Sequence, residues 1–378
     1  MAVSLPIPVE IVYQTAQLES AVKAICNSQA IAVDTESNSY DYYPEQMCLI
    51  QIATGSKIYL VDTIILNEIP SLKDVLENTS IVKVLHGADY DIRTLDRHYA
   101  FHIRNLYDTN IAAIFAGLPG VGLSALINDL LGMTIVKSQQ LQRSHWGQRP
   151  LSTEALEYAA TDVRHLLAIK QILDQKLHKL GRTEWVAEEC VRLEVVRYQK
   201  PNPDTAYLSV KGAQDLDGRS LAILRSLFVF REKEAQLQHR PLYYIIPDAL
   251  LVSMSTNPPA NLFGVPGLRQ IGQQRFRTGL KQALREGLDA PLINRPVVDQ
   301  RESVNPKQFQ RLRHLKGWRE SKGAALSLAP SILWPKSSLE RLAKAPDTLN
   351  IELTSADVLN WQRDLLGADL SAYLKSLK

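Results

Sequence analysis

The stretch AIAVDTE, residues 30–36, joins a short apolar run that is typical of a buried strand to two acidic residues. We expect this strand to end at Asp34. Residues two apart on a strand point to the same face of a sheet, so Asp34 and Glu36 should project together beside the end of the sheet. A strand that is buried on both faces does not normally end in two anions. This pair is therefore a candidate for chemistry.

Further strand patterns follow this stretch along the chain. A tight-turn signal, TGS at residues 54–56, separates two apolar segments that are rich in β-branched residues. Because the connections are short, we predict an antiparallel meander over residues 31–61. The predicted strands after the first lie at residues 48–53, 57–61 and 81–85, with a fifth at 104–107.

Helical patterns dominate the rest of the chain. Apolar residues at helical spacing predict one long helix from Ser152 to about Leu177. The fold class predicted is therefore α/β, a mixed sheet with flanking helices, followed by an all-helical remainder. Polar segments that contain prolines predict a linker at residues 198–217 and a break at 294–306. The predicted domains are residues 1–200, 215–292 and 305–378.

The two helical segments on either side of the second break resemble each other. The sequence LFVFRE at residues 227–232 corresponds to LKGWRE at 315–320, an offset of 88 residues. The same offset relates Pro247 to Pro335, Leu251 to Leu339 and Pro258 to Pro346. Several matches at one offset predict a duplicated helical module.

Composition and charge limit the classes of function. The chain has 378 residues and a net charge of +3, but residues 1–200 carry 18 Lys+Arg against 23 Asp+Glu, and residues 201–378 carry 25 against 17. An acidic half that can hold metal is thus joined to a basic half that can hold a polyanion. No apolar run approaches the roughly 18–20 residues that span a bilayer. The three cysteines form no CxxC motif, so we expect a cytoplasmic, non-membrane protein.

A second acidic motif, HGADYD at residues 86–91, follows the predicted strand at 81–85 and begins a helix. Asp89 is expected to cap this helix, accepting hydrogen bonds from the first-turn amides. Asp91 lies in the first turn, where the helix dipole favours an anion. His86 is expected to be a hydrogen-bonded structural histidine.

A third motif places Tyr158 four residues before Asp162 on the predicted long helix, so both side chains share one helix face. Asp34, Glu36, Asp91 and Asp162 then form a set of four carboxylates from three elements. Hard divalent cations prefer oxygen ligands, and this set is suited to two Mg²⁺ or Mn²⁺ ions about 3.5–4 Å apart, as in phosphoryl-transfer sites. Because a phenol with a pKa near 10 is a poor base at neutral pH, Tyr158 is expected to orient the attacking water.

These motifs in this order resemble the DEDD superfamily of 3′–5′ exonucleases and, within it, the ribonuclease D family. Tyr158 at four residues before Asp162 corresponds to the tyrosine branch, and Trp146 followed by RPL at 149–151 supports the match. The resemblance implies a ribonuclease H-like fold, two Mg²⁺ or Mn²⁺ ions and release of nucleoside 5′-monophosphates from RNA 3′ ends. Precursor tRNA is the partner expected from it. His145 departs from the family pattern, which often has an acidic residue there.

The helical half resembles the HRDC (helicase and ribonuclease D C-terminal) module. The residues that carry this resemblance are REKE at 231–234, Pro241, IPD at 246–248 and VPG at 265–267. Residues 307–378 resemble a second, more diverged copy.

A basic stripe is predicted on the helix that follows Gly272. Arg277, Lys281 and Arg285 recur every four residues on one face, which is suited to contacts with the phosphates of a nucleic acid. A solvated surface accounts for the same pattern equally well.

Two alternatives to an exoribonuclease remain open at this stage. The same carboxylate site can cut DNA, since nothing in the sequence reads a 2′-hydroxyl unambiguously. A non-catalytic RNA-binding protein is the second alternative, although a binder has no need to keep four anions together. No GxxxxGK[ST] motif supports a nucleotide-binding enzyme, and the sequence does not predict an oligomeric state.

Overall fold

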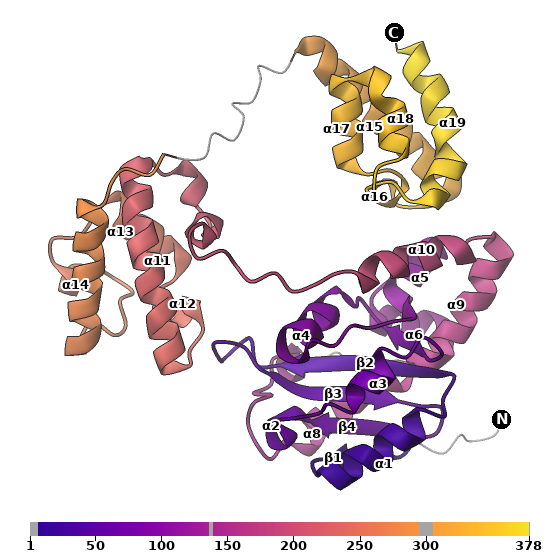
Figure 1. Cartoon of the computed structure of the whole chain (residues 1–378), viewed down its shortest axis with the longest axis horizontal. Coiled ribbons are helices and arrows are strands. Elements are labelled where there is room, and N and C mark those ends of the chain that lie inside the picture. The colour runs from indigo at the N-terminus through magenta and orange to yellow at the C-terminus, as the bar shows by residue number, and fades with distance from the viewer. Residues whose placement is uncertain (1–6, 136–138, 295–304, 378) are drawn as a thin grey trace.

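A six-stranded mixed sheet forms the centre of the first unit of this protein, in a computed structural model that describes residues 7–135, 139–294 and 305–377 (Figure 1). The strand order is β1-β4-β3-β2-β5-β6. The strands are β1 (Val9–Val12), β2 (Ala30–Ser37), β3 (Met47–Ala53), β4 (Ile58–Asp62), β5 (Val82–Leu85) and β6 (Leu106–Asp108).

The predicted meander is confirmed, because β2 pairs with β3 and β3 with β4 in antiparallel register. Strands β1, β5 and β6 join the sheet through parallel pairs. The sequence analysis missed β1, which is four residues long and has little apolar alternation.

The prediction that the first strand ends at Asp34 is wrong. Strand β2 continues to Ser37, because its backbone keeps pairing with β3 through Asp34 opposite Gln51 and Glu36 opposite Leu49. Both acidic residues are therefore held within a hydrogen-bonded strand, which fixes their side chains more firmly than a strand end would.

Helices cover both faces of this sheet. They are α1 (Thr15–Ile25), α2 (Thr63–Leu66), α3 (Leu72–Leu76), α4 (Asp89–Tyr99), α5 (Thr109–Phe115), α6 (Leu123–Leu131), α7 (Gln139–Gln142), α8 (Thr153–Arg164), α9 (Leu166–Leu180) and α10 (Thr183–Glu194). The predicted long helix is wrong in one respect: the backbone at His165, with φ −104° and ψ −9°, interrupts it between α8 and α9.

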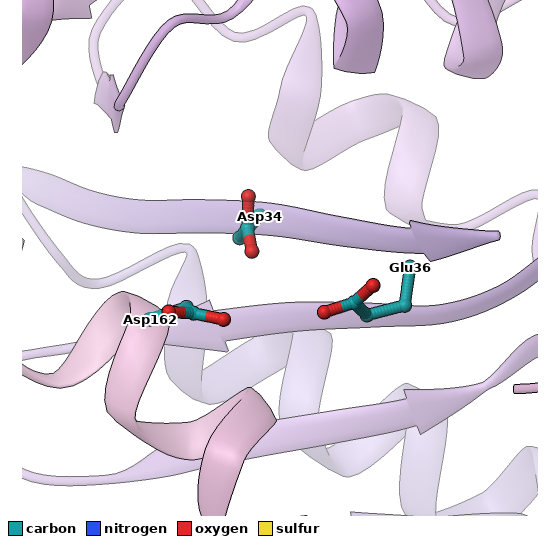
Figure 2. A group of neighbouring side chains, drawn as sticks. All are labelled: Asp34, Glu36 and Asp162. Carbon is teal, nitrogen blue, oxygen red and sulfur yellow. The ribbon is translucent and has the colours of Figure 1, made fainter. Parts of the chain in front are cut away.

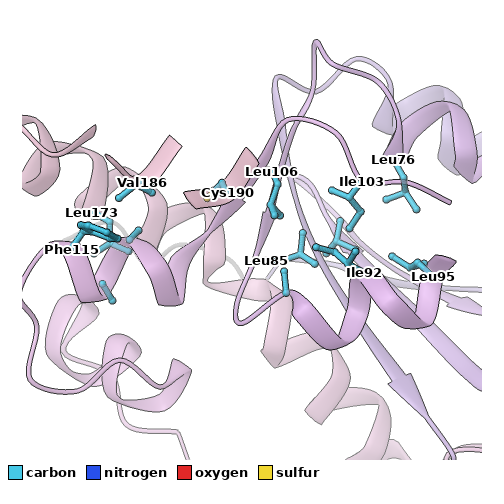
Figure 3. Close-up of a cluster of buried hydrophobic side chains, with 14 of the residues drawn as sticks. Leu76, Leu85, Ile92, Leu95, Ile103, Leu106, Phe115, Leu173, Val186 and Cys190 are labelled. Carbon is cyan, nitrogen blue, oxygen red and sulfur yellow. The ribbon is translucent and has the colours of Figure 1, made fainter. Parts of the chain in front are cut away.

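Buried side chains hold α4 against the sheet. Figure 3 shows Leu85 of β5 and Leu106 of β6 beside Ile92 and Leu95 of α4, all within one apolar cluster. Leu85, Ile92 and Leu95 are at most 1% exposed. This packing fixes the first turn of α4 at the end of β5.

The second unit has an apolar core of its own. Its elements are η1 (Ala206–Ser209), η2 (Ala213–Asp215), α11 (Gly218–Gln238), α12 (Leu242–Ile245), α13 (Asp248–Thr256), η3 (Leu262–Gly264) and α14 (Gln274–Asp289). The linker predicted at residues 198–217 is only partly a linker, because Tyr207, Val210 and Ala213 are buried in this core. The domain boundaries remain a prediction.

The third unit repeats the second. It consists of α15 (Pro306–Leu326), α16 (Pro330–Leu333), α17 (Lys336–Lys344), η4 (Pro346–Thr348), α18 (Leu349–Leu353) and α19 (Asn360–Ser376). At the offset of 88 residues, the bounds of α11, α12 and α13 coincide with those of α15, α16 and α17. The guanidinium of Arg231 donates to the carbonyl oxygen of Ile246 at 3.0 Å, and that of Arg319 donates to Trp334 at 2.9 Å. The predicted duplication therefore extends to packing.

Aromatic side chains join the third unit to the first. The ring of Trp361 stacks on Trp185 of α10 at 4.9 Å and meets Phe115 of α5 edge-on at 5.2 Å. Arg182 donates to the carbonyl oxygens of Phe115 and Leu326, both at 2.8 Å. Within the helices of the described ranges, none combines the length and the apolarity that a membrane crossing requires.

Replacing Trp361 with Ala should weaken this contact by about 3 kcal/mol, because a large buried aromatic ring is removed. In the Trp361→Ala variant, we expect calorimetry to show the third unit melting at a lower temperature than the first unit. Phe309→Ala is the control, since Phe309 is 63% exposed. Identical melting curves for the two variants would contradict this view of the contact.

Candidate active site

Three carboxylates meet between β2 and α8. Asp34 and Glu36 of β2 and Asp162 of α8 each offer an oxygen atom, and these oxygens lie within 4.8 Å of one another. Figure 2 shows Asp162 facing the strand that carries the other two. Oxygen atoms at this spacing can bind a divalent cation together.

Small side chains allow α8 to come close to the sheet. Ala159, Ala160 and Val163 are fully buried and pack in one cluster with Ala32 of β2. Because Ala32, Asp34 and Glu36 alternate along the strand, all three lie on the face that α8 covers. The hydroxyl of Ser152 accepts from the amide of Ala155 at 3.2 Å and fixes where α8 begins.

Asp91 lies beside this group and is 6% exposed. The hydroxyl of Thr35 donates to its carboxylate at 2.5 Å, so β2 holds the first turn of α4 by a side-chain contact as well. Asp91 lines the same cleft as the other three carboxylates. All four acidic residues of the sequence prediction are therefore brought together. Their roles remain a prediction.

The prediction that Asp89 caps α4 is wrong. Its side chain instead pairs with Arg93, one turn further along the helix, at 2.8 Å. The amides of Gly87 and Ala88 donate to the carboxylate of Asp108 at 3.0 and 2.8 Å. Asp108 lies at the end of β6, where it also caps α5. Its carboxylate accepts the amide hydrogen bonds of the loop before α4, so Asp89 is not needed for this.

His86 has the structural contact that the sequence predicts. Its Nδ1 lies 2.9 Å from the hydroxyl of Thr109, which donates to the carbonyl oxygen of Leu85 at 3.0 Å. Because that hydroxyl has a single proton, the proton between the two side chains belongs to His86 Nδ1.

Burial raises the pKa of every carboxylate in the group, and repulsion from the other carboxylates adds to it for Asp34 and Glu36. Desolvation is the main cause, and it raises the pKa of Asp162 to about 7 and that of Asp91 to about 6. The pKa values of Asp34 and Glu36 lie well above their usual range because of burial and then of the neighbouring carboxylates. A divalent cation would remove this repulsion, so the donor set fits a metal site.

A buried amide lies beside this donor set. Gln51 is paired with Asp34 across β2 and β3 and is fully buried. Its side-chain oxygen and nitrogen have no hydrogen-bond partner within the described part of the chain. Directly opposed residues of an antiparallel pair share a face, so this amide lies on the carboxylate side of the sheet. The sequence analysis missed it, although a glutamine within an apolar strand is a recognisable signal.

Tyr158 lies at the rim of the same cleft. Its hydroxyl lies near the carboxylate of Asp162, and its ring lies 6.2 Å from that of the buried Trp146. Burial and then the nearby carboxylates raise the pKa of the Tyr158 hydroxyl. The phenol is therefore neutral near pH 7 and can donate a hydrogen bond, but it cannot act as a base.

These side chains surround a cleft of about 360 Å³. It is lined by Asp34, Thr35, Glu36, Ser37, Ser39, Tyr40, His86, Tyr90, Asp91, Leu123, Gln142, Ser144, Trp146, Tyr158, Asp162 and Leu166.

Comparison with known proteins agrees with this arrangement. A family model described as 3′–5′ exonuclease matches residues 9–178, and the HRDC domain model matches residues 220–284. A ribonuclease D of Xanthomonas oryzae pv. oryzae is 30% identical over 350 residues, which cover 92% of this chain and 93% of that protein. The chain belongs to the ribonuclease D family. The predictions of a nuclease enzyme and of its fold are thereby confirmed.

Solved structures share the same architecture. The Escherichia coli RNase D structure superposes with a TM-score of 0.73, at 23% identity, over 97% of this chain and 99% of that one. The catalytic core of RRP6 from Trypanosoma brucei gives a TM-score of 0.66 at 27% identity, over 76% of this chain and 80% of that one. The sheet with its helices and the HRDC region are therefore features of the ribonuclease D fold.

Arg149 fixes the loop that completes this ribonuclease D site. Its guanidinium makes two contacts with the carboxylate of Asp62, at 2.5 and 2.8 Å, and donates to the carbonyl oxygens of Cys48 and Trp146. The loop that carries Trp146 is thus tied to β3 and β4. The RPL motif indicated the family in the sequence, but it did not reveal this role.

Two other predicted features lie outside the carboxylate group. Nδ1 of His145, the departure from the family pattern, lies in hydrogen-bond contact with the carboxylate of Asp41. The basic stripe on α14 does not line the cleft. Arg277 lies over the ring of Phe263 at 5.0 Å, and Arg285 lies 3.7 Å from Asp289. Nucleic-acid binding by this stripe remains a prediction.

Asp162→Asn should stabilise the metal-free protein at pH 8. Because the folded-state pKa of Asp162 lies above its unfolded value near 3.9, the folded state binds more protons between the two values. Stability in chelator therefore falls as the pH rises from about 4 to about 7. We expect the variant to melt about 5 °C higher than wild type at pH 8, because it removes roughly 2 kcal/mol of the cost of burying this charge, and to melt at the same temperature as wild type at pH 4.

The matched control is Asp89→Asn, which removes a largely exposed carboxylate of α4. It should change the melting temperature little at either pH. A difference between wild type and Asp162→Asn that is the same at pH 4 and pH 8 would contradict the electrostatic explanation.

Proposed function

We propose that this protein is a metal-dependent 3′–5′ exoribonuclease that releases nucleoside 5′-monophosphates. Asp34, Glu36, Asp91 and Asp162 would hold two divalent cations, Mg²⁺ or Mn²⁺. The observation that carries the proposal is the meeting of these carboxylates in one cleft, with pKa values raised by burial and, for Asp34 and Glu36, also by the neighbouring carboxylates. A protein that used them for structure alone would not keep buried anions in contact.

Bound divalent cations would supply the charge that lowers the pKa of an attacking water and stabilises the leaving oxygen. The chain itself contributes position. Strand pairing holds Asp34 and Glu36, the packing of α8 holds Asp162, and Thr35 holds Asp91. The scissile phosphate would thus bind beside charged groups whose positions are fixed before the substrate arrives. Preorganised charge of this kind is a large contribution to catalysis.

Tyr158 would orient the attacking water. Its raised pKa keeps the hydroxyl proton in place at neutral pH, so the hydroxyl can donate a hydrogen bond beside the carboxylate of Asp162. The ring of the buried Trp146 lies 6.2 Å from that of Tyr158 and supports it at the rim of the cleft. A water molecule held there would face the phosphate in a fixed direction.

The substrate proposed is the 3′ end of structured RNA such as precursor tRNA. The support comes from relatives named ribonuclease D and from the Escherichia coli RNase D structure, which is described as an exoribonuclease involved in structured RNA processing. The cleft has room for about one nucleotide at a time, which suits removal of single residues from an end.

End-labelled RNA tests polarity and metal dependence together. With Mg²⁺ or Mn²⁺, a 3′-labelled RNA should release labelled mononucleotide at once, and a 5′-labelled RNA should shorten stepwise. Chelator should stop both reactions. A 5′-labelled RNA that loses labelled mononucleotide first would contradict the proposed polarity, and full activity in chelator would contradict the metal site.

Asp34→Asn and Asp162→Asn should each lower the rate at least 1,000-fold, because each removes a ligand charge from the metal site. Asp89→Asn, which alters an acidic residue outside the cleft, should keep the wild-type rate. If either ligand variant stayed fully active with Mg²⁺, the assignment of these carboxylates would be wrong.

Tyr158→Phe should lower kcat about 100-fold and change KM less than twofold, since the ring remains and only the orienting hydroxyl is lost. Single-turnover kinetics on a short RNA would measure the chemical step directly. An unchanged kcat would exclude the water-orienting role and leave the rest of the site intact.

The alternatives of a DNA exonuclease and a non-catalytic binder are separated by the same assay. RNA and DNA of equal sequence, digested in competition, give the preference for sugar. RNA binding without release of mononucleotide under every metal condition would favour the binder.

A further inference from the structure

Tyrosine and arginine side chains gather where the exonuclease domain meets the HRDC domain, beyond the rim of the cleft. We call this group the Tyr–Arg platform; it consists of Tyr40, Arg143, Arg240, Tyr243, Tyr244 and Arg269. We propose that the Tyr–Arg platform binds the single-stranded RNA segment that leads into the active site. This inference rests on the proposed function and names the surface that would hold the substrate upstream of its 3′ end.

The tyrosines of the platform are exposed and adjoin the cleft. Tyr40 is 53% exposed, Tyr243 56% and Tyr244 38%. Tyr40 also lines the cleft that holds the carboxylates. The rings of Tyr40 and Tyr243 lie 6.5 Å apart, so a strand that leaves the cleft over Tyr40 meets Tyr243 next. Unpaired bases stack on exposed rings of this kind without regard to sequence.

Arginines lie over two of these rings. The guanidinium of Arg143 lies 5.6 Å from the ring centre of Tyr40. Those of Arg240 and Arg269 lie 5.2 and 5.8 Å from the ring centre of Tyr244. A guanidinium that rests on a ring keeps its N–H groups directed outward in its own plane, where they can bind phosphate.

These arginines are exposed and are not used in ion pairs within the part of the chain that the structure describes. Their positive charge is therefore available to a polyanion. On α14, by contrast, Arg285 lies near Asp289, and no residue of the stripe lines the cleft. The platform thus suits a strand that enters the active site better than the α14 stripe does.

Three further contacts fix the two halves of the platform relative to each other. The hydroxyl of Tyr243 donates to the carbonyl oxygen of Tyr40 at 2.8 Å. Tyr42 stacks on His239 with ring centres 5.0 Å apart, and the hydroxyl of Tyr43 donates to Glu232. The loop between β2 and β3 therefore attaches the HRDC domain through its neighbouring tyrosines. An attached platform loses less entropy on binding RNA than two independent surfaces would.

The test measures affinity for an adenosine decamer and for the adenosine dinucleotide, by anisotropy of a 5′ fluorescent label. The full chain carries Asp162→Asn, so that the probe stays intact with Mg²⁺. We expect the decamer to bind at least tenfold more tightly than the dinucleotide, because only the decamer reaches the platform. Arg240→Ala with Arg269→Ala, and Tyr243→Ala with Tyr244→Ala, should each lose most of this gain.

Salt dependence separates charge from stacking. Removing the two arginines should lower the slope of log affinity against log salt by about 1.4, since single-stranded nucleic acids release about 0.7 ion per contact. The two tyrosine substitutions should weaken binding and keep the slope. Tyr244→Phe retains the ring and should bind the decamer within twofold of the parent.

Lys176→Ala with Lys179→Ala is the matched control, because it removes two exposed positive charges from α9, a helix that contributes no residue to the platform or to the lining of the cleft beyond Leu166. It should leave decamer affinity within twofold of the parent. Equal losses in the control and the arginine variant would overturn the proposal, as would undiminished binding by the arginine variant. A loss confined to Arg277→Ala with Lys281→Ala would also overturn it in favour of α14.

The proposed function and the platform inference can be contradicted independently of each other. If the chain without Asp162→Asn does not shorten RNA in the end-labelling assay, the exoribonuclease proposal is wrong whatever the anisotropy shows. If it shortens RNA and the platform variants bind the decamer normally, only the platform inference is wrong.

Discussion

Repulsion among buried carboxylates is the constraint on which the rest of the first unit depends. Oxygens of Asp34, Glu36 and Asp162 lie within 4.8 Å of one another; burial raises the pKa of all three, and repulsion from neighbouring carboxylates raises that of Asp34 and Glu36 further. Contacts elsewhere must therefore supply the stability that this group removes. Continuous pairing of β2 with β3 and the close approach of α8, made possible by its alanines, provide it. The packing of the domain thus acts to hold together charges that would separate on their own.

Much of this could be predicted from the sequence because the relevant signals are local. The spacing of Asp34 and Glu36, and of Tyr158 and Asp162, follows directly from the periods of strand and helix. The repeat at 88 residues was visible for the same reason. The errors have physical causes as well. The extent of β2 depends on its partner strand, and the cap of α4 depends on Asp108, which lies on another element.

The contacts that could not be predicted are those between residues far apart in the sequence. Arg149 reaches Asp62 across 87 residues, and Thr35 reaches Asp91 across 56. Gln51 gave a local signal, a polar residue inside an apolar strand, but its importance depends on its register opposite Asp34. Tyr43 and Glu232 are 189 residues apart. Nothing in the order of residues indicates such pairs, because they arise only when whole elements pack.

The duplicated helical modules have kept one framework and diverged in what they touch. Both retain an arginine that donates to a carbonyl oxygen just before the module's third helix, the buried Arg231 in one copy and the half-buried Arg319 in the other. One copy contacts the tyrosine-bearing loop beside the cleft, whereas the other is seated on α5 and α10 through Trp361. The same helical framework, present twice, thus contacts the first unit through two different surfaces. Substitutions in the contact beside the cleft need not disturb the contact with α5 and α10. The surface over which a substrate reaches the cleft can therefore change while the third unit stays bound to the first.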